Sequence, residues 1–324
     1  MVRDAVSAGP VRLGWEVIGQ GELGPGPRSR HGLVYDRKRN AAVLFGGILW
    51  EAGEFLLNDT WELRGRQWMA IETDRRPPPR HRSAMVYLDR RGESLLFGGE
   101  GYRSDGYYSL GDTWLYADRQ WRRMRFWWRS PPPRFGHSLA YDERMGVAVL
   151  FGGVDRRDEP FGDTWLFDGR TWLPVRGLAP PARRYAAFAY DPDLEGCVLH
   201  GGAEDDHGQR VFGDTWLFRE GRWTPLGEEF DLRPRDDHGI GYQRDVGRLV
   251  LLEGLRGPRE VLTRGRSGWE QAEVAPMHAL HQCSPMVWNE ELGGLLRHGG
   301  EVSHQGAQFD ATLLLRARPA AQAR

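Results

Sequence analysis

The strongest constraint on this sequence is a six-fold repeat of an apolar segment that ends in two glycines. The strings VLFGG, LLFGG, VLFGG, VLHGG, LLEGL and LRHGG place a glycine pair, or its remnant, near residues 46, 98, 152, 201, 253 and 299. Successive pairs are 52, 54, 49, 52 and 46 residues apart. A period of this length indicates repeated units that bury their apolar faces against one another.

Each period contains four short segments with the character of β-strands. The first is apolar, as in HGLVYD, and the second ends in the glycines, which can leave the strand with a positive φ. In the first four periods the third segment begins with Asp-Thr-Trp, and the fourth carries a second tryptophan seven residues later. The short polar turns are typical of hairpins. The pattern predicts an all-β, six-bladed β-propeller of four-stranded antiparallel blades.

An N-terminal outer strand is expected to close the ring. The fourth strands carry Trp15, Trp68, Trp121, Trp172, Trp223 and Trp269. Trp15 precedes the first blade, whereas the last blade ends at its third strand, FDATLLLRAR. We therefore expect residues 1–10 to form an extension, residues 11–316 the propeller, and residues 317–324 a disordered tail. The join would remove an exposed sheet edge.

These motifs, as in PRFGHSLAYDERMGVAVLFGG followed by GDTWLFDGRTW, resemble the kelch repeat. The resemblance covers residues 11–316 and is complete in blades one to four; blade five lacks its first glycine and the Asp-Thr-Trp motif. It implies a fold similar to the central domain of galactose oxidase. Kelch propellers bind proteins, bind sugars or act as enzymes, so the resemblance leaves the activity open. The Tyr-His dipeptide of the copper-radical oxidases is absent from the sequence.

Composition narrows the class of partner. The 44 basic and 45 acidic residues are interspersed and give a formal net charge of −1, which argues against nucleic acid or an anionic membrane as the partner. The two cysteines, Cys197 and Cys283, have no zinc-site spacing. No signal peptide or membrane-spanning run is visible, so we expect a cytoplasmic monomer.

One face of the propeller is the better candidate for binding. The loops between second and third strands, together with the blade-to-blade connections, form what we call the long-loop face. Long variable loops on a rigid ring are where binding residues are commonly placed. Three tryptophans outside the blade pattern, Trp50, Trp127 and Trp128, map to this face. They either cover the blade ends or form an aromatic platform for a sugar, a peptide or an apolar ligand.

Alignment of the blades places basic residues where each chain segment enters its first strand. The column consists of Arg28, Arg80, Arg134, Arg183, Arg235 and His281. Converging guanidiniums would bind a carboxylate or phosphate. The alternative is that these arginines brace the blades by pairing with loop carbonyls and carboxylates. Glu100 and Glu301, directly after their glycine pairs, are further candidates at the same opening.

Histidine and aspartate positions offer possible metal ligands. His31, His137 and His238 occupy alternate blades, and three imidazoles can in principle bind a metal. The string DDHG occurs twice, which makes Asp206, His207, Asp237 and His238 candidates for a divalent cation or for acid–base chemistry. The other interpretation is solvated turn chemistry or blade packing. No other cofactor is expected.

We therefore expect a recognition module that binds a protein partner or a small anionic or carbohydrate ligand on the long-loop face. The alternative is an enzyme, such as an isomerase, lyase, cyclase or metal-dependent enzyme, that uses Arg, His and Asp or Glu at the same opening. Function should lie where the blades differ, at His281, at Cys283 and around the two DDHG strings.

Overall fold

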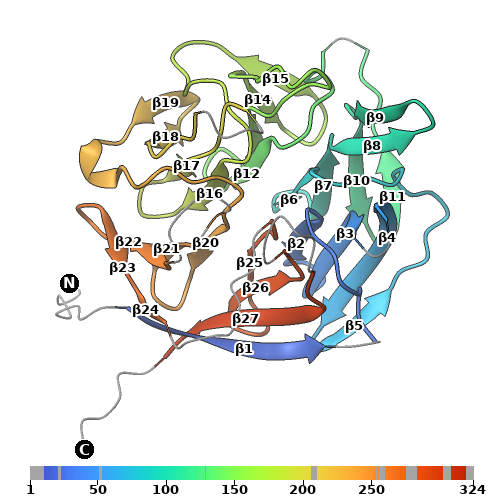
Figure 1. Cartoon of the computed structure of the whole chain (residues 1–324), viewed down its shortest axis with the longest axis horizontal. Helices are drawn as coiled ribbons and strands as arrows, with labels where there is room; N and C mark the ends of the chain where they lie inside the picture. The colour runs from blue at the N-terminus through green and yellow to red at the C-terminus, as the bar shows by residue number, and fades with distance from the viewer. Residues whose placement is uncertain are drawn as a thin grey trace, which may run out of the picture.

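Six β-sheets are arranged around a central axis in the computed structural model (Figure 1). The structure describes residues 11–20, 23–50, 53–127, 129–205, 210–252, 254, 260–274, 283–301 and 308–318. Helix in these residues is limited to a single 3₁₀ turn, η1 (Glu228–Phe230). The predicted all-β propeller with six four-stranded antiparallel blades is confirmed.

Each of the first three blades runs from an inner to an outer strand in chain order. Blade one comprises β2 (Gly32–Asp36), β3 (Ala41–Leu49), β4 (Phe55–Arg64) and β5 (Gln67–Ala70). Blade two comprises β6 (Ala84–Leu88), β7 (Glu93–Phe97), β10 (Thr113–Ala117) and β11 (Gln120–Arg123). Blade three comprises β12 (Ser138–Asp142), β13 (Val147–Phe151), β14 (Thr164–Phe167) and β15 (Trp172–Val175). A two-stranded hairpin, β8 (Glu100–Arg103) and β9 (Gly106–Ser109), is inserted in blade two.

The remaining blades keep this order until the ring closes. Blade four comprises β16 (Ala187–Asp191), β17 (Gly196–His200), β18 (Thr215–Arg219) and β19 (Arg222–Pro225). Blade five comprises β20 (Ile240–Gln243), β21 (Arg248–Leu251), β22 (Leu262–Arg264) and β23 (Trp269–Gln271). Blade six comprises β25 (Val287–Asn289), β26 (Gly294–His298), β27 (Ala311–Ala317), β1 (Arg12–Gln20) and β24 (Glu273–Val274).

Blade six combines strands from the beginning and the end of the described chain. β1 pairs antiparallel with β27, with Trp15 opposite Leu315, as the sequence predicts. The short strand β24 pairs in parallel with β1 and adds a fifth strand that the sequence does not indicate. Figure 1 shows the dark blue strand beside the red one. The outer edge of blade six is therefore covered.

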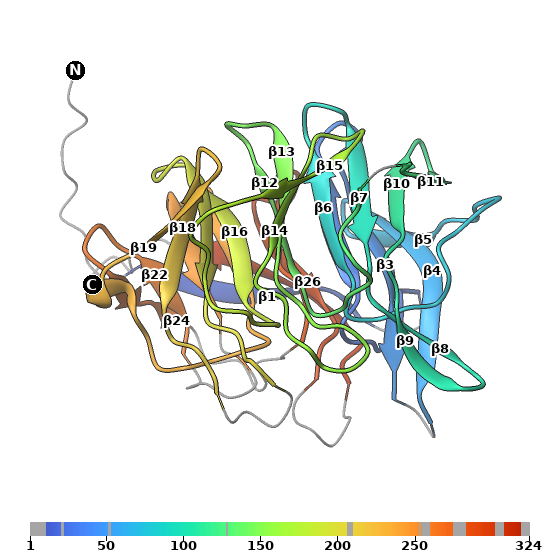
Figure 2. The ribbon, with the colours of Figure 1, turned by 90° about the horizontal axis from the view of Figure 1, so that it is seen from above.

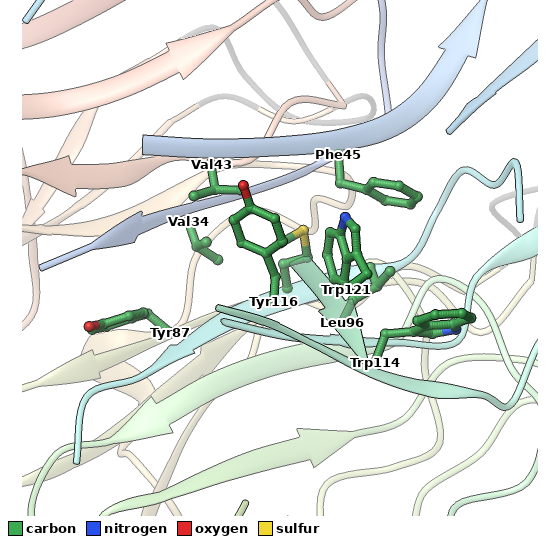
Figure 3. Close-up of a cluster of buried hydrophobic side chains, with 9 residues drawn as sticks. Val34, Val43, Phe45, Tyr87, Leu96, Trp114, Tyr116 and Trp121 are labelled. Atoms are coloured by element: carbon green, nitrogen blue, oxygen red, sulfur yellow. The ribbon is translucent and has the colours of Figure 1, made fainter. Parts of the chain in front are cut away.

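The hydrophobic core lies between neighbouring blades. Between blades one and two, Phe45 and Tyr116 contact Trp121, with ring centroids 5.0 and 4.9 Å apart (Figure 3). The Trp121 Nε1 donates to Thr60 Oγ1 of blade one at 2.9 Å. The equivalent bonds join Trp172 to Thr113 and Trp223 to Thr164. The second tryptophan of a blade thus binds the threonine of the previous Asp-Thr-Trp motif, which explains why both residues repeat.

Trp172→Phe is expected to lower the free energy of unfolding by about 1–3 kcal/mol, because it leaves the buried Thr113 hydroxyl without its donor. The ring contacts with Phe97 and Phe167 are largely retained. Urea titration followed by tryptophan fluorescence measures the change. Trp127→Phe is the control, since Trp127 is 94% exposed and should change stability by less than about 0.5 kcal/mol. Equal losses in both variants would contradict the assignment.

No helix in the described part of the chain is long and apolar enough to cross a membrane.

Candidate functional site

Each arginine of the column at the blade entrances is enclosed by residues of its own blade. Arg134 donates from Nε to the Pro132 carbonyl at 3.1 Å and from Nη1 to the Gly152 carbonyl at 2.9 Å. Its two Nη atoms also bind both oxygens of Asp163, and its guanidinium lies 4.0 Å from the Phe161 ring centroid. The residue is completely buried. One side chain thus connects the proline run, the glycine pair and the Asp-Thr-Trp motif.

The same arrangement recurs around the ring. The carboxylate partners of Arg28, Arg80, Arg183 and Arg235 are Asp59, Asp112, Asp214 and Glu260. All five arginines are at most 2% exposed. Burial opposes ionisation of the aspartates, but the bound guanidinium outweighs it and lowers the pKa of Asp59, Asp112, Asp163 and Asp214. This geometry matches the bracing alternative. A ligand-binding role for these arginines stays a prediction.

A different set of residues lines the opening of the central channel on the long-loop face. They lie two positions after the arginine column, and we call them the mouth ring: Arg30, Arg82, Gly136, Tyr185, Asp237 and Cys283. Each backbone N–H donates to the carbonyl of the ring residue in the preceding blade, at 2.8 to 3.4 Å, so the bonds form a closed circle. All six residues have φ between +53° and +62°, and five of them are not glycine. Such conformations are concentrated at functional sites.

The glycine of the mouth ring makes room for a neighbouring aromatic side chain. A Cβ at position 136 would lie 2.6 Å from Cε1 of Tyr185, which shows that the tyrosine ring covers Gly136. The Arg82 guanidinium is 5.7 Å from the Tyr185 ring centroid and 5.4 Å from that of Phe135. The absence of a side chain at 136 is therefore what allows Arg82 and Tyr185 to approach across blade three.

On the other side of the ring, a thiol lies between an acid and a base. Cys283 Sγ is 3.4 Å from Oδ2 of Asp237 and 4.0 Å from Nη2 of Arg30. Burial and the Asp237 charge raise the pKa of Cys283, so the thiol is neutral and donates to the carboxylate. Burial disfavours the Arg30 cation, but the Asp237 and Glu301 carboxylates raise its pKa above the usual range. The Arg30 Nε is 3.2 Å from Oε1 of Glu301.

Glu100 binds the mouth arginine of blade two, as Glu301 binds Arg30. Its Oε2 lies 2.9 Å from Nε2 of His81 and 3.0 Å from Nη1 of Arg82. Burial lowers the pKa of His81 to about 4, although the Glu100 hydrogen bond opposes this. The His81 ring stacks on Tyr107 of β9 at 5.8 Å. Both predicted glutamates, Glu100 and Glu301, therefore hold the mouth arginines.

Two hairpins form a wall beside this part of the mouth. β3–β4 of blade one and β8–β9 of blade two extend beyond the other strands at the same end of the ring (Figure 2). They are joined by a hydrogen bond from the Tyr107 hydroxyl to Glu54. Phe55 and Tyr102 on these hairpins are 55% and 62% exposed. Tyr107 links the wall to the mouth, because it stacks on His81, which shares Glu100 with Arg82.

The three alternate-blade histidines face the blade interfaces. His31 packs on His298, His137 on Phe97 and His238 on His200, with ring centroids 5.4 to 6.1 Å apart. Each side chain is at most 8% exposed. No described group is within hydrogen-bond distance of either ring nitrogen in His31 or His238. In the part of the chain that the structure covers, no three His, Cys, Asp or Glu side chains are placed to hold a metal ion.

The structure describes some of the other predicted site residues and not the rest. Asp237 and His238 of the second DDHG string both line the vestibule at the mouth ring, where His238 is buried and packs on His200. His281, Trp128, Asp206 and His207 lie outside the described residues. Trp50 is half-buried and its backbone N–H binds Gln308, whereas Trp127 is almost fully exposed.

The opposite end of the channel is crossed by ion pairs. Arg37 lies within 3.4 Å of carboxylate oxygens of Asp89, Glu143 and Glu290, which come from three other blades. Arg244 contacts the same two glutamates at 3.4 and 3.5 Å. A cavity of about 200 Å³ at this end is lined by four of these charged residues together with apolar side chains, whereas the vestibule at the mouth ring is about 160 Å³. On the long-loop face, the described residues of the mouth combine this space with unlike charged groups.

The comparisons with known proteins agree with the repeat and the fold. The chain is similar to an F-box/kelch-repeat protein of Arabidopsis thaliana, with 28% identity over 187 residues, 52% of this chain and 37% of the relative. It is 33% identical over 142 residues to tRNA wybutosine-synthesizing protein 4 of Aspergillus fumigatus, covering 41% of this chain and 13% of the relative. It is 25% identical over 241 residues to Host cell factor homolog hcf-1 of Caenorhabditis elegans, covering 65% and 29%. The chain thus spans less than two fifths of each relative.

The solved structure of YjhT superposes on this chain with a TM-score of 0.70 and 15% identity, covering 92% of this chain and 99% of YjhT. At this identity the likeness concerns the fold alone. No family model matches the chain.

Proposed function

Because the chain is a six-bladed kelch-type propeller, we propose that it is a recognition module that binds a protein partner on its long-loop face. The observation that carries the proposal is the mouth ring. The blades repeat one another in their bracing residues but differ in the ring, where Arg82, Tyr185 and Asp237 occupy equivalent positions. A scaffold role alone would not require different chemistry at each blade.

The mouth offers hydrogen-bond donors and acceptors close together. The guanidiniums of Arg30 and Arg82 are donors, and the Asp237 carboxylate is an acceptor. A loop tip of a partner protein presents the complementary set, since its backbone carries both C=O and N–H groups. A vestibule of about 160 Å³ has room for a side chain, and the exposed Phe55 and Tyr102 give the surrounding surface apolar contacts.

Selection of a phage-displayed library of disulfide-closed peptide loops on the wild-type protein tests this proposal. We expect selected loops to lose at least about tenfold in affinity with Arg82→Ala and, separately, with Asp237→Ala, a change of about 1.4 kcal/mol in binding free energy. Arg222→Ala on the exposed outer strand of blade four is the control and should change nothing. Circular dichroism checks that each variant folds. Loops that tolerate both mouth substitutions would place recognition elsewhere and refute the proposal.

The second candidate function is acid–base catalysis at the same mouth. The adjacent Asp237 carboxylate and Cys283 thiol support it, because the neutral thiol can act as a proton donor and the carboxylate as a base. The raised pKa of Cys283 argues against a nucleophilic role. Deuterium incorporation from D₂O into a panel of sugars and small carbonyl compounds, followed by NMR, tests this candidate. Incorporation should disappear with Asp237→Asn; its absence with the wild type for every compound would exclude the panel as substrates.

A further inference from the structure

A row of basic residues follows the outer strand of blade two, away from the mouth ring. The strand β11 ends at Arg123, and the chain continues into the connection to blade three. In this segment exposure alternates. Met124 and Phe126 are half-buried and pack against the core between blades two and three, with the Phe126 ring 6.2 Å from Phe167. Arg123, Arg125 and Trp127 are exposed.

Alternation of this kind places every second side chain on the same side of an extended chain. The outward side chains of the segment therefore form a row, which we call the blade-two row: Arg123, Arg125 and Trp127, at which the chain bends. In an extended stretch alternate side chains are about 6.6–7 Å apart, because each residue advances about 3.3–3.4 Å. The apolar side chains that point inward fix the segment on the propeller, so the row is held in place.

The row is open to solvent and strongly basic. Trp127 is 94% exposed, and Arg123 and Arg125 are also exposed. Among the residues that the structure covers, the ion pair to Glu93 is made by the neighbouring Arg122, and none joins Arg123 or Arg125 to a carboxylate. Arg123 has a longer-range effect, since it helps to lower the pKa of Asp112. A cluster of unpaired guanidiniums beside an exposed indole is the composition of a protein-binding surface.

Equivalent positions in the other blades carry different residues. The row of blade one contains Ala70, Glu72 and Asp74, and that of blade three contains Pro174, Arg176 and Leu178. Blade four has Pro225, Gly227 and Glu229. The basic row is therefore not a requirement of the repeat, and propeller packing does not explain it.

We propose that the blade-two row binds an extended acidic segment of a partner protein. Acidic side chains at alternate positions of such a segment have the same spacing as the row and would pair with its guanidiniums, while an apolar side chain covers Trp127. β11 is the edge strand of its sheet, so an extended partner can lie alongside it. Nucleic acid is disfavoured because acidic and basic residues balance over the chain, with a net charge of −1. This surface is separate from the mouth ring and goes beyond the function proposed above.

Fluorescence anisotropy with a fluorescein-labelled peptide of alternating aspartate and serine, with a central leucine, tests the proposal. We expect binding at low salt that weakens as sodium chloride is raised. The charge reversal Arg123→Glu with Arg125→Glu should weaken it at least tenfold, and Trp127→Ala should weaken it several-fold. The matched control reverses two exposed arginines on blade four, Arg219→Glu with Arg222→Glu, and should leave the affinity unchanged.

Several results would overturn the proposal. Absence of binding to the wild type, or equal loss in the blade-four control, would show that the row does not select acidic segments. Tighter row-dependent binding of an oligothymidylate than of the peptide would assign the row to nucleic acid. Row-dependent self-association in sedimentation would assign it to a second copy, through the acidic Glu72 and Asp74 of blade one. Arg82→Ala should leave binding of the acidic peptide intact. A negative result for the blade-two row can therefore be distinguished from a negative result for recognition at the mouth ring.

Discussion

Acidification from pH 7 to pH 5 is expected to remove most of the stability of this propeller. The six histidines in the described chain are all buried: His31, His81, His137, His200, His238 and His298. Burial lowers the pKa of His81 and His298 to about 4 and that of His137 and His200 to about 3, and it lowers those of His31 and His238 well below the usual value. These side chains are neutral in the fold at pH 5, whereas in the unfolded chain they titrate near pH 6.5.

The sign follows from which state binds more protons. A histidine whose pKa is lower in the folded state contributes stability that is fully present above about pH 6.5 and is lost as the pH falls toward its folded pKa. Between pH 7 and pH 5 the loss is about 2 kcal/mol for each histidine, or roughly 10 kcal/mol for six. Native domains have stabilities of roughly 5–15 kcal/mol, so unfolding should occur near pH 5. Asp142 and Asp231, whose pKa values are raised by burial, act in the opposite direction but are only two groups against six histidines.

Urea titrations at pH 5, 6 and 7, followed by tryptophan fluorescence, measure this loss. His137→Ser provides a matched variant, because blades two and six carry Ser83 and Ser284 at the equivalent position. The difference in free energy of unfolding between this variant and the wild type should shift by about 2 kcal/mol in favour of the variant from pH 7 to pH 5. Stability that is unchanged between pH 7 and pH 5 would show that these imidazoles are not held neutral.

Asp112→Ala is expected to lower the free energy of unfolding by about 3–5 kcal/mol. The Arg80 guanidinium is completely buried and binds both Asp112 oxygens, at 2.7 and 2.9 Å. Removal of the carboxylate leaves a buried charge without its counterion, and the Trp114 Nε1 also loses its acceptor. The cost is large because a buried charge without its counterion is strongly unfavourable, even though the intact pair contributes little net stability.

Two variants separate this effect from a general loss of an aspartate. Asp74→Ala, at an exposed position, should change stability by less than about 0.5 kcal/mol. The double variant Arg80→Met with Asp112→Ala removes both charges and should recover a substantial part of the loss. A loss below about 1 kcal/mol for Asp112→Ala would show that solvent reaches Arg80 and that bracing is weak.

The fold could be predicted from the sequence because its signals repeat. Glycine pairs, Asp-Thr-Trp motifs and the position of Trp15 each point to the same arrangement, and β1 beside β27 confirms the expected closure. The strand β24 was not predicted, because a two-residue strand leaves no periodic pattern. The partner of each second tryptophan, such as Thr60 for Trp121, depends on how neighbouring blades are aligned.

The candidate site was predicted only in part. Five arginines in six blades form the most visible column, and the structure pairs them with carboxylates of their own blades, which agrees with a shared packing role for identical residues at equivalent positions. The mouth residues lie two positions further on, and Arg30, Arg82 and Tyr185 were missed. Their signal is the variety of side chains in one column, together with a left-handed backbone that only the structure reveals. Cys283 was identified because its blade departs from the others.

The pairing of β1 with β27 has a consequence for how the protein is made. During synthesis β1 leaves the ribosome before the other described strands, yet its antiparallel partner β27 is the last of them. Until β27 emerges, β1 can pair only with the two-residue strand β24, and the mouth circle of hydrogen bonds is incomplete until Cys283 emerges. A chain stalled in translation before blade six would therefore present β1 without its sheet to chaperones and proteases, and it becomes resistant only when the ring is joined.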